Sequence, residues 1–129
     1  IIDGTRITSL AAFYDEISRV LIPGAKWGRN IDAFDDILQG GFGTPPEGFT
    51  IKWSNAAFSE EKLGYPETIK FLEEKMRRCH PSNRESVRAE LTAARAGAGP
   101  TLYQWIIEII RDHGPGGEQA EDNVNLVLG

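Results

Sequence analysis

Apolar residues recur every three or four positions in five segments of this chain, which is the spacing of one buried face of an α-helix. These predicted helices span about residues 10–21, 31–39, 66–78, 83–96 and 102–112. Apolar residues instead alternate with polar ones in the segments 49–53 and 124–128, a pattern that predicts half-buried strands. Strands separated by helices favour a parallel sheet with helical crossovers, so the predicted fold class is α/β.

Residues with strong preferences for helix ends support these boundaries. The side chains of Asn30 and Thr101 can accept a hydrogen bond from a free amide of the first turn, so each is a predicted N-cap. Pro66 suits the first turn of a helix, because it lacks an amide hydrogen that would be unpaired there. Ser82 and Glu85 have the spacing of a capping box, which predicts that the fourth helix opens here.

The segment 31–39 combines an apolar stripe with an unusually acidic outer surface. Ile31, Phe34 and Leu38 fall on one face and are predicted to be buried. Gly40 suits the left-handed residue that ends a helix. Three aspartates, with no Lys or Arg in the helix to pair them, are expected to project from the remaining surface: Asp32, Asp35 and Asp36.

The residues alone leave two explanations of this acidic surface open. Carboxylates near a helix N-terminus complement the helix dipole, which accounts for Asp32 but poorly for Asp35 and Asp36, beyond the first turn. Asp32 and Asp36 are four residues apart and repel each other, so a surface needed only for solubility would mix signs. Clustered carboxylates are instead typical of a site that binds a basic partner.

Length, composition and charge limit the classes of protein to which this chain can belong. A chain of 129 residues forms one domain, and its single cysteine, Cys79, excludes an internal disulfide and is typical of a reducing compartment. No apolar run is long enough to span a membrane and no signal-peptide pattern opens the sequence, so we expect a cytoplasmic protein without membrane contact. The net charge is −5, of which residues 59–98 carry +1 and the rest −6. Such an acidic chain repels nucleic acid and attracts a basic protein.

The sequence contains no pattern typical of an enzyme, a cofactor site or a metal site. Cys79 and His80 are adjacent and His113 is far away, which is not the spacing of metal ligands. The glycine-rich segment 40–43 follows a predicted helix instead of a strand, so it is not a phosphate-binding loop. Three carboxylates on one convex helix also differ from a hydrolytic pair, whose members face each other across a cleft. We therefore expect no catalytic residues, no cofactor and no metal.

Residues 27–40 resemble the central segment of the barstar family, the intracellular inhibitors of small secreted ribonucleases such as barnase. The shared pattern is Trp27-Gly28-x-Asn30-Ile31-Asp32-Ala33-Phe34-x-Asp36-x-Leu38-x-Gly40. The family has an aromatic-Gly-x-Asn-Leu-Asp-Ala core here, a second Asp four residues after the first, then Leu and Gly. Weaker similarity links the family's strands and its last helix to residues 2–4, 49–53, 102–112 and 124–128. The resemblance is dense over residues 25–41 and does not cover residues 59–98.

The resemblance implies a barstar-like fold, which is a three-stranded parallel sheet with helical crossovers. The whole chain, residues 1–129, would form a single barstar-like domain. The two helices predicted within about residues 59–98 look like a helical insertion in one of the crossovers.

The resemblance also implies an activity, the occlusion of a ribonuclease active site by the acidic helix and the loop before it. Carboxylates would take the positions of substrate phosphate oxygens, because the cations that hold phosphate also bind carboxylate. Asp36 matches the family's principal inhibitory aspartate, and Asp32 is its expected partner. Trp27 and Gly28 would shape the loop, and Glu108 lies near a ribonuclease-contacting acid of the family's last helix. The expected partner is a small secreted microbial ribonuclease of the barnase or guanyl-specific type, bound one to one.

Several expected contact positions depart from the family pattern. Lys26 and Asp35 stand where the family has aromatic contact residues, and Arg29 stands where it has an acid. The aromatic residue expected directly after the helix is not found at Gly41, although Phe42 can serve with a small shift. Exchanged charges redirect specificity, so these differences predict a different target ribonuclease.

Two alternatives to this function remain open. One is an immunity protein that neutralises the nuclease domain of an exported antibacterial toxin through the same surface. The other is an interaction module of barstar-like fold that meets no nuclease and uses the middle helices instead. Its basic patch would consist of Lys75, Arg77, Arg78, Arg84 and Arg88. Interleaved acidic residues favour a charge-balanced, solvated face in the same place; they are Glu73, Glu74, Glu85 and Glu90.

Overall fold

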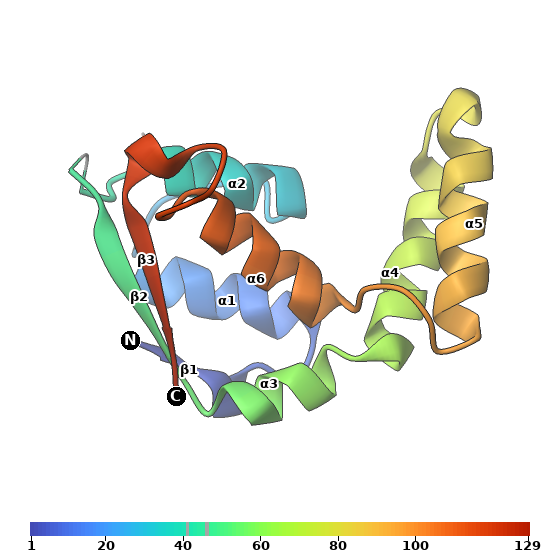
Figure 1. Ribbon diagram of the computed structural model, residues 1–129, viewed down its shortest axis with the longest axis horizontal. Helices are drawn as coiled ribbons and strands as arrows, with labels where there is room; N and C mark the ends of the chain where they lie inside the picture. The colour runs from blue at the N-terminus through green and yellow to red at the C-terminus, as the bar shows by residue number, and fades with distance from the viewer. Residues whose placement is uncertain (41, 46) are drawn as a thin grey trace.

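A sheet of three parallel strands forms one layer of the protein (Figure 1). The computed structural model describes residues 1–40, 42–45 and 47–129. The strands, in their spatial order, are β1 (Ile2–Asp3), β2 (Phe49–Ser54) and β3 (Val124–Leu128). The central strand β2 places Trp53 opposite Ile2 of β1, and Phe49 opposite Val124 of β3. The predicted α/β class and its parallel sheet are confirmed.

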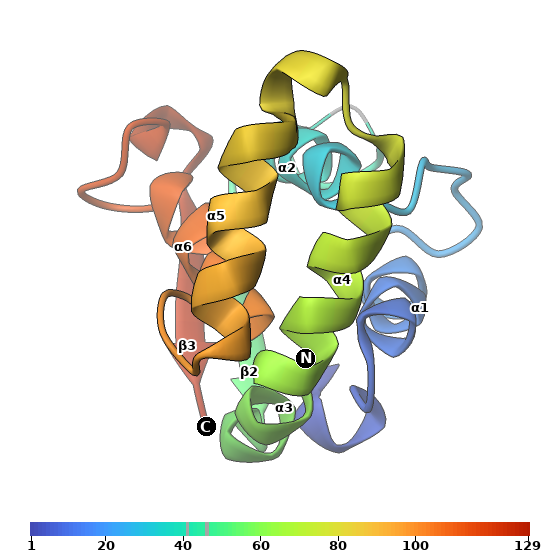
Figure 2. The same ribbon diagram turned by 90° about the vertical axis from the view of Figure 1, so that its right-hand side faces the viewer.

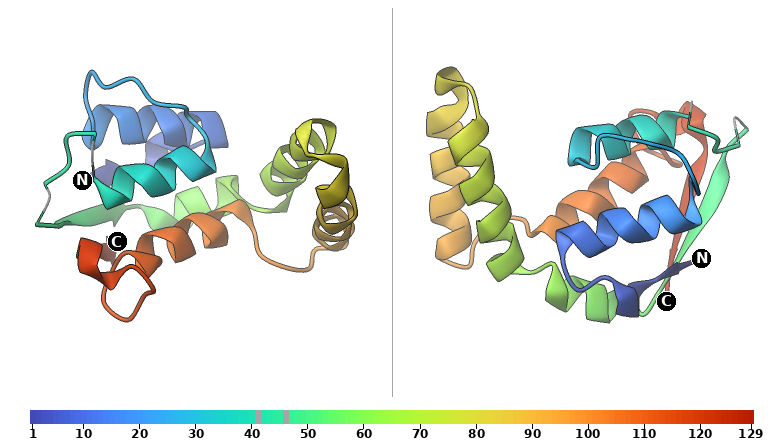
Figure 3. Two further views of the ribbon diagram at one scale, coloured as in Figure 1. Left: turned by 90° about the horizontal axis from the view of Figure 1, so that it is seen from above. Right: turned by 180° about the vertical axis from the view of Figure 1, so that it is seen from behind.

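Helices cover one face of this sheet. Within the described residues the α-helices are α1 (Leu10–Val20), α2 (Ile31–Gln39), α3 (Ala56–Lys62), α4 (Tyr65–Arg78), α5 (Arg84–Arg95) and α6 (Leu102–Asp112). The views from above and behind show α1, α2 and α6 on the same side of the strands (Figure 3). The five predicted helices are found, and α3 is additional. Among the described segments, no helix is both long and apolar enough to cross a membrane.

Aromatic side chains from four elements form the centre of the core. Phe13 of α1 stacks on Trp53 of β2, with ring centroids 5.8 Å apart. Phe13 also meets Phe34 of α2 edge-on at 5.2 Å, and Trp53 meets Tyr103 of α6 at 5.7 Å. Because Phe13, Phe34 and Trp53 are fully buried, this cluster fixes the three covering helices on the sheet.

A buried hydroxyl joins α3, β2 and the turn after β1 next to this cluster. Ser59 of α3 accepts a hydrogen bond from the indole N–H of Trp53 at 2.9 Å and donates one to the carbonyl of Gly4 at 3.0 Å. Leu63, directly after α3, is fully buried in the same core. This helix escapes prediction from the sequence because it has seven residues and the side chains it buries, those of Ala56 and Ser59, are small.

Helices α4 and α5 form an antiparallel hairpin (Figure 2), here called the arm (residues 65–95), which stands away from the sheet (Figure 1). Its small separate core consists of Leu72, Leu91 and Ala94. The arm is tied to the start of α6, where the amide of Leu102 donates to Oγ1 of Thr68 at 2.9 Å. The arm occupies most of the segment 59–98, whereas the first residues of that segment belong to α3 and the main core.

The capping box predicted for Ser82 and Glu85 is wrong. Ser82 lies inside a short 3-10 turn, and its amide donates to Nδ1 of His80 at 3.1 Å. α5 therefore begins at Arg84, and its N-cap residue Asn83 makes no side-chain capping bond. The predicted N-cap of α6 is confirmed, and it has the reciprocal hydrogen bonds of a capping box.

We expect Ser59→Ala to lower the free energy of unfolding by about 1–3 kcal/mol, because it leaves the buried indole N–H of Trp53 without an acceptor. Equilibrium urea unfolding, followed by tryptophan fluorescence, measures this change. Ser86→Ala, at an exposed position of α5, is the matched control and should change the stability by less than about 0.5 kcal/mol. Equal effects of the two substitutions would contradict the role assigned to Ser59.

Candidate functional site

The acidic helix α2 has nine residues, and its ends are set by Asn30 and Gly40. Oδ1 of Asn30 accepts a hydrogen bond from the amide of Ala33 at 2.8 Å, which confirms the predicted N-cap. Gly40 has the positive φ expected of the residue after the helix, 104°, but its ψ of −179° is extended instead of helical. The side chains that α2 buries in the main core are Phe34, Ile37 and Leu38.

Two aspartates of α2, Asp32 and Asp36, are exposed one turn apart on the helix. Among the described residues, neither carboxylate forms an ion pair or a hydrogen bond. Like charges at this spacing repel each other by a few tenths of a kcal/mol, roughly. A cation from outside would relieve that repulsion, so the pair keeps its full capacity to bind one.

The third aspartate, Asp35, is already bound within the protein. The imidazole of His113, directly after α6, is fully buried, and its Nε2 lies 2.6 Å from Oδ1 of Asp35. Its Nδ1 lies 2.6 Å from Oδ2 of Asp122. The prediction that all three aspartates project unpaired is therefore wrong for Asp35. Its partner is 78 positions away in the sequence, where no local pattern reveals it.

The two carboxylates favour the protonated form of His113. Burial alone lowers the pKa of His113, but hydrogen bonds to Asp35 and Asp122, together with their negative charges, outweigh burial and raise the pKa above the usual 6.5. Each ring N–H of the protonated imidazole then donates a hydrogen bond to one carboxylate. This arrangement of Asp35, His113 and Asp122, here called the His113 bridge, ties α2 to the end of α6 and to the turn before β3.

The loop before α2 is pinned to α1 at two points. Trp27 donates its indole N–H to Oγ of Ser18 at 2.7 Å and meets the ring of Tyr14 edge-on at 5.5 Å. Arg29 has a positive φ of 51°, and its guanidinium pairs with the carboxylate of Asp15 on α1. The side chain of Trp27 is thus half-buried, and the positive charge of Arg29 is partly neutralised inside the protein.

The remaining predicted contact residues lie before α2, after α2 and on α6. Lys26 and Gly28 are exposed in the loop before α2. Phe42, just after α2, is half-buried and packs against the main core, while Gly41 lies outside the described residues. Glu108 is exposed on α6, where it lines a groove together with the first turn of α2.

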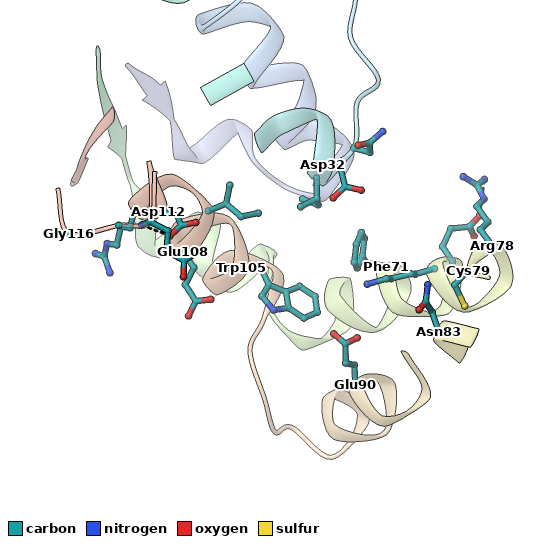
Figure 4. Close-up of a pocket in the computed structure, with 18 of the residues that line it drawn as sticks. Asp32, Phe71, Arg78, Cys79, Asn83, Glu90, Trp105, Glu108, Asp112 and Gly116 are labelled. Carbon is teal, nitrogen blue, oxygen red and sulfur yellow. Dashed lines mark hydrogen bonds and ion pairs between the residues drawn. The ribbon is translucent and has the colours of Figure 1, made fainter. Parts of the chain in front are cut away.

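This groove, of about 1290 Å³, lies between α2, α6 and the arm (Figure 4). The first turn of α2 contributes Asp32 to its lining, and α6 contributes Glu108. Trp105 and Ile109 of α6 are half-buried and line the groove. α6 packs against the arm as well as the sheet, so it has two apolar faces. Tyr103 and Ile107 of the same helix are buried.

The arrangement of α2 is suited to binding another protein. Asp32 and Asp36 project from the same helix one turn apart and do not face each other across a cleft, as a hydrolytic pair would. In the part of the chain that the structure describes, no group of three or more His, Cys, Asp or Glu side chains is placed to hold a metal ion. What α2 offers is a fixed helix with two free carboxylates, which can accept charge-assisted hydrogen bonds from Arg or Lys side chains of a partner.

Comparison with known protein families identifies the model described as Barstar (barnase inhibitor), which matches residues 1–92. No curated protein and no solved structure matches the chain. The matched residues include every predicted contact position except Glu108, and they stop short of His113 and Asp122.

The His113 bridge predicts a stability that falls as pH rises. Because the pKa of His113 is raised in the folded protein above its ordinary 6.5, the bridge stabilises the fold fully below that pH and loses its contribution as pH climbs through the raised pKa. Urea unfolding of the wild type at about pH 6 and about pH 9 should show this decline. Asp35→Asn should reduce this decline of stability with pH. It should also lower the free energy of unfolding by about 1.5–3 kcal/mol at the lower pH, since a charged hydrogen bond is lost.

Asp36→Asn is the matched control for this pH dependence. It makes the same change one position along the helix, at a carboxylate without a partner in the described residues. The stability of this variant should therefore decline with pH as that of the wild type does. A decline of the same size in Asp35→Asn would contradict the bridge.

Proposed function

We infer that this chain, which belongs to the barstar family, inhibits a small secreted microbial ribonuclease of the barnase or guanyl-specific type. The observation that carries this proposal is the pair of exposed, unpaired carboxylates, Asp32 and Asp36, on a helix that the His113 bridge holds in place. Family membership supports an inhibitor and not an enzyme. The net charge of −5 supports a basic partner.

The proposed mechanism is occlusion of the ribonuclease active site by α2 and the loop before it. A ribonuclease must hold the phosphates of its substrate with cationic side chains, and a carboxylate binds the same groups by charge-assisted hydrogen bonds. Asp36 is the proposed central anchor, and Asp32 is the second contact. Because neither has an ion-pair partner within the described residues, no internal pair has to be broken when the ribonuclease docks.

Asp35 and Trp27 have supporting roles in this mechanism. His113 holds the carboxylate of Asp35, so the middle of α2 is already fixed before the partner arrives. Trp27 fixes the preceding loop through its hydrogen bond to Ser18. A surface that is ordered in advance loses little conformational freedom on binding, and more of the contact energy then appears as affinity.

The charges at the rim of α2 are proposed to select the target. Lys26 is exposed and would meet the ribonuclease directly, whereas Arg29 is partly neutralised by Asp15. Lys26 then favours a target with an acidic group beside its active site and repels one whose rim is basic throughout. Phe42 and Glu108 would flank the central contact, in a one-to-one complex formed in the cytoplasm.

Inhibition should depend strongly on Asp36. We expect Asp36→Ala to weaken inhibition by at least roughly thirtyfold, or about 2 kcal/mol, because a central charged contact is lost. The measurement is a titration against barnase-type and guanyl-specific ribonucleases and the nuclease domains of antibacterial toxins, at low and moderate salt. Salt should slow the association of the wild type.

Glu61→Ala provides the control for that titration. Glu61 is an exposed acid on α3, at the other end of the molecule from α2, so its loss should leave inhibition nearly unchanged (Figure 1). Equal weakening by the two variants would show that total charge, and not the acidic helix, governs binding. A ribonuclease inhibited equally well by wild type and Asp36→Ala would contradict the proposed anchor.

A further inference from the structure

The groove between α2, α6 and the arm continues the proposed ribonuclease-binding surface. It begins at the first turn of α2, where Ile31 and Asp32 line it, and it extends along α4 as far as Cys79 (Figure 4). Its volume of about 1290 Å³ exceeds the roughly 300–1,000 Å³ typical of small-molecule sites. The groove therefore has room for a segment of another protein.

The floor of the groove is apolar and open. Phe71 of α4 and Trp105 of α6 meet edge to face, with ring centroids 6.0 Å apart, and both are only partly buried. Ile31 and Ile109 add partly exposed aliphatic surface beside them. Aromatic rings in a concave surface are the side chains that most often anchor a protein partner.

The walls of the groove are acidic on balance. Their carboxylates belong to Asp32, Glu74, Glu90, Glu108, Asp112 and Glu118. Their basic side chains are Lys75, Arg78 and Arg111. Arg78 is already paired with Glu74 at 2.9 Å. The lining residues that form no ion pair among the described residues are two cations, Lys75 and Arg111, and five acids, Asp32, Glu90, Glu108, Asp112 and Glu118, so the free charge in the groove is negative on balance.

We propose that the groove receives a surface loop of the same ribonuclease. An apolar side chain of that loop packs on Phe71 and Trp105, and neighbouring Lys or Arg side chains meet Asp32 and Glu90. This inference rests on the proposed function and assigns the arm to the same interface. In this arrangement α2 covers the active site of the ribonuclease, and the arm binds a loop of the ribonuclease beside that site.

Charge complementarity selects this occupant over a second copy of the chain. A ribonuclease binds a polyanion and carries basic side chains around its active site, which match the free carboxylates of the groove. A second copy would bring another net charge of −5 to an acidic surface. The groove also starts at the helix turn that carries Asp32, so a partner docked on α2 lies within its reach.

Cys79 reports directly on whether the groove is filled, because it is the single cysteine of the chain and lines the groove. In a complex with an inhibited ribonuclease, Ellman's reagent should label Cys79 at least about tenfold more slowly than in the free protein. Ribonuclease alone is the blank. A matched reporter on α3, Ala57→Cys in a Cys79→Ser background, should label at the same rate with and without ribonuclease.

Each outcome of this labelling experiment bears on a different part of the proposal. Unchanged labelling of Cys79 in a fully inhibited complex would overturn the groove assignment and leave inhibition by α2 intact. A wild type that binds no ribonuclease of the panel would overturn both. Protection of Cys79 that grows with protein concentration, without ribonuclease, would assign the groove to a second copy and overturn the proposal too.

Charge reversal on α5 gives a second test. Glu90→Arg should weaken binding of the inhibited ribonuclease by about tenfold or more, because an acid facing a basic loop becomes a repulsive cation. Glu85→Arg makes the same change on the same helix, at an exposed position outside the groove lining, and should change binding by less than about twofold. Equal weakening by both variants would overturn the assignment.

Discussion

The hydrogen bonds of the buried His113 side chain to Asp35 and Asp122 are the interaction on which the proposed binding surface depends. α2 has only nine residues, and an isolated helix that short is not stable in water. Its apolar side packs on the core, and the His113 bridge fixes another part of its surface to the end of α6. In its protonated form His113 also offsets part of the negative charge of Asp35. The helix thus presents Asp32 and Asp36 beside a third carboxylate whose repulsion is reduced.

Signals that lie within a few residues of each other allowed most of the fold to be predicted. The cap at Asn30 and the apolar stripe after it located α2, and the alternation over residues 49–53 located β2. The capping-box pattern at Ser82 predicted the wrong helix start, because the amide of Ser82 is hydrogen-bonded within the 3-10 turn before α5. α3 is too short to show a helical period of apolar residues. His113 gives no local signal, since its two partners are brought to it by the packing of α2 and the turn before β3. The groove arises from how the arm stands against α6, which residue spacing does not encode.

The surface proposed to bind a ribonuclease has a convex part and a concave part. α2 and its preceding loop are convex and carry the free charge of Asp36, whereas the groove is concave, with the rings of Phe71 and Trp105 at its floor. A partner must offer a cationic cleft for the first and a protruding loop for the second. Two such demands on shape discriminate between basic ribonucleases more sharply than charge alone does.

Along the sequence, the arm lies between β2 and β3, two strands that are neighbours in the sheet. This position makes the length and charge of the arm easy to change. β2 ends at Ser54 and β3 begins at Val124, so the chain closes a long crossover before these strands pair. The entropic cost of closing a loop grows with the logarithm of its length, by about 0.6 kcal/mol for each doubling. Since the arm also has a small core of its own, descendants of this sequence can lengthen, shorten or recharge it while the sheet and α2 stay as they are. Evolution can in this way alter how the arm of the proposed inhibitor contacts a ribonuclease without changing α2 and its central contact, Asp36.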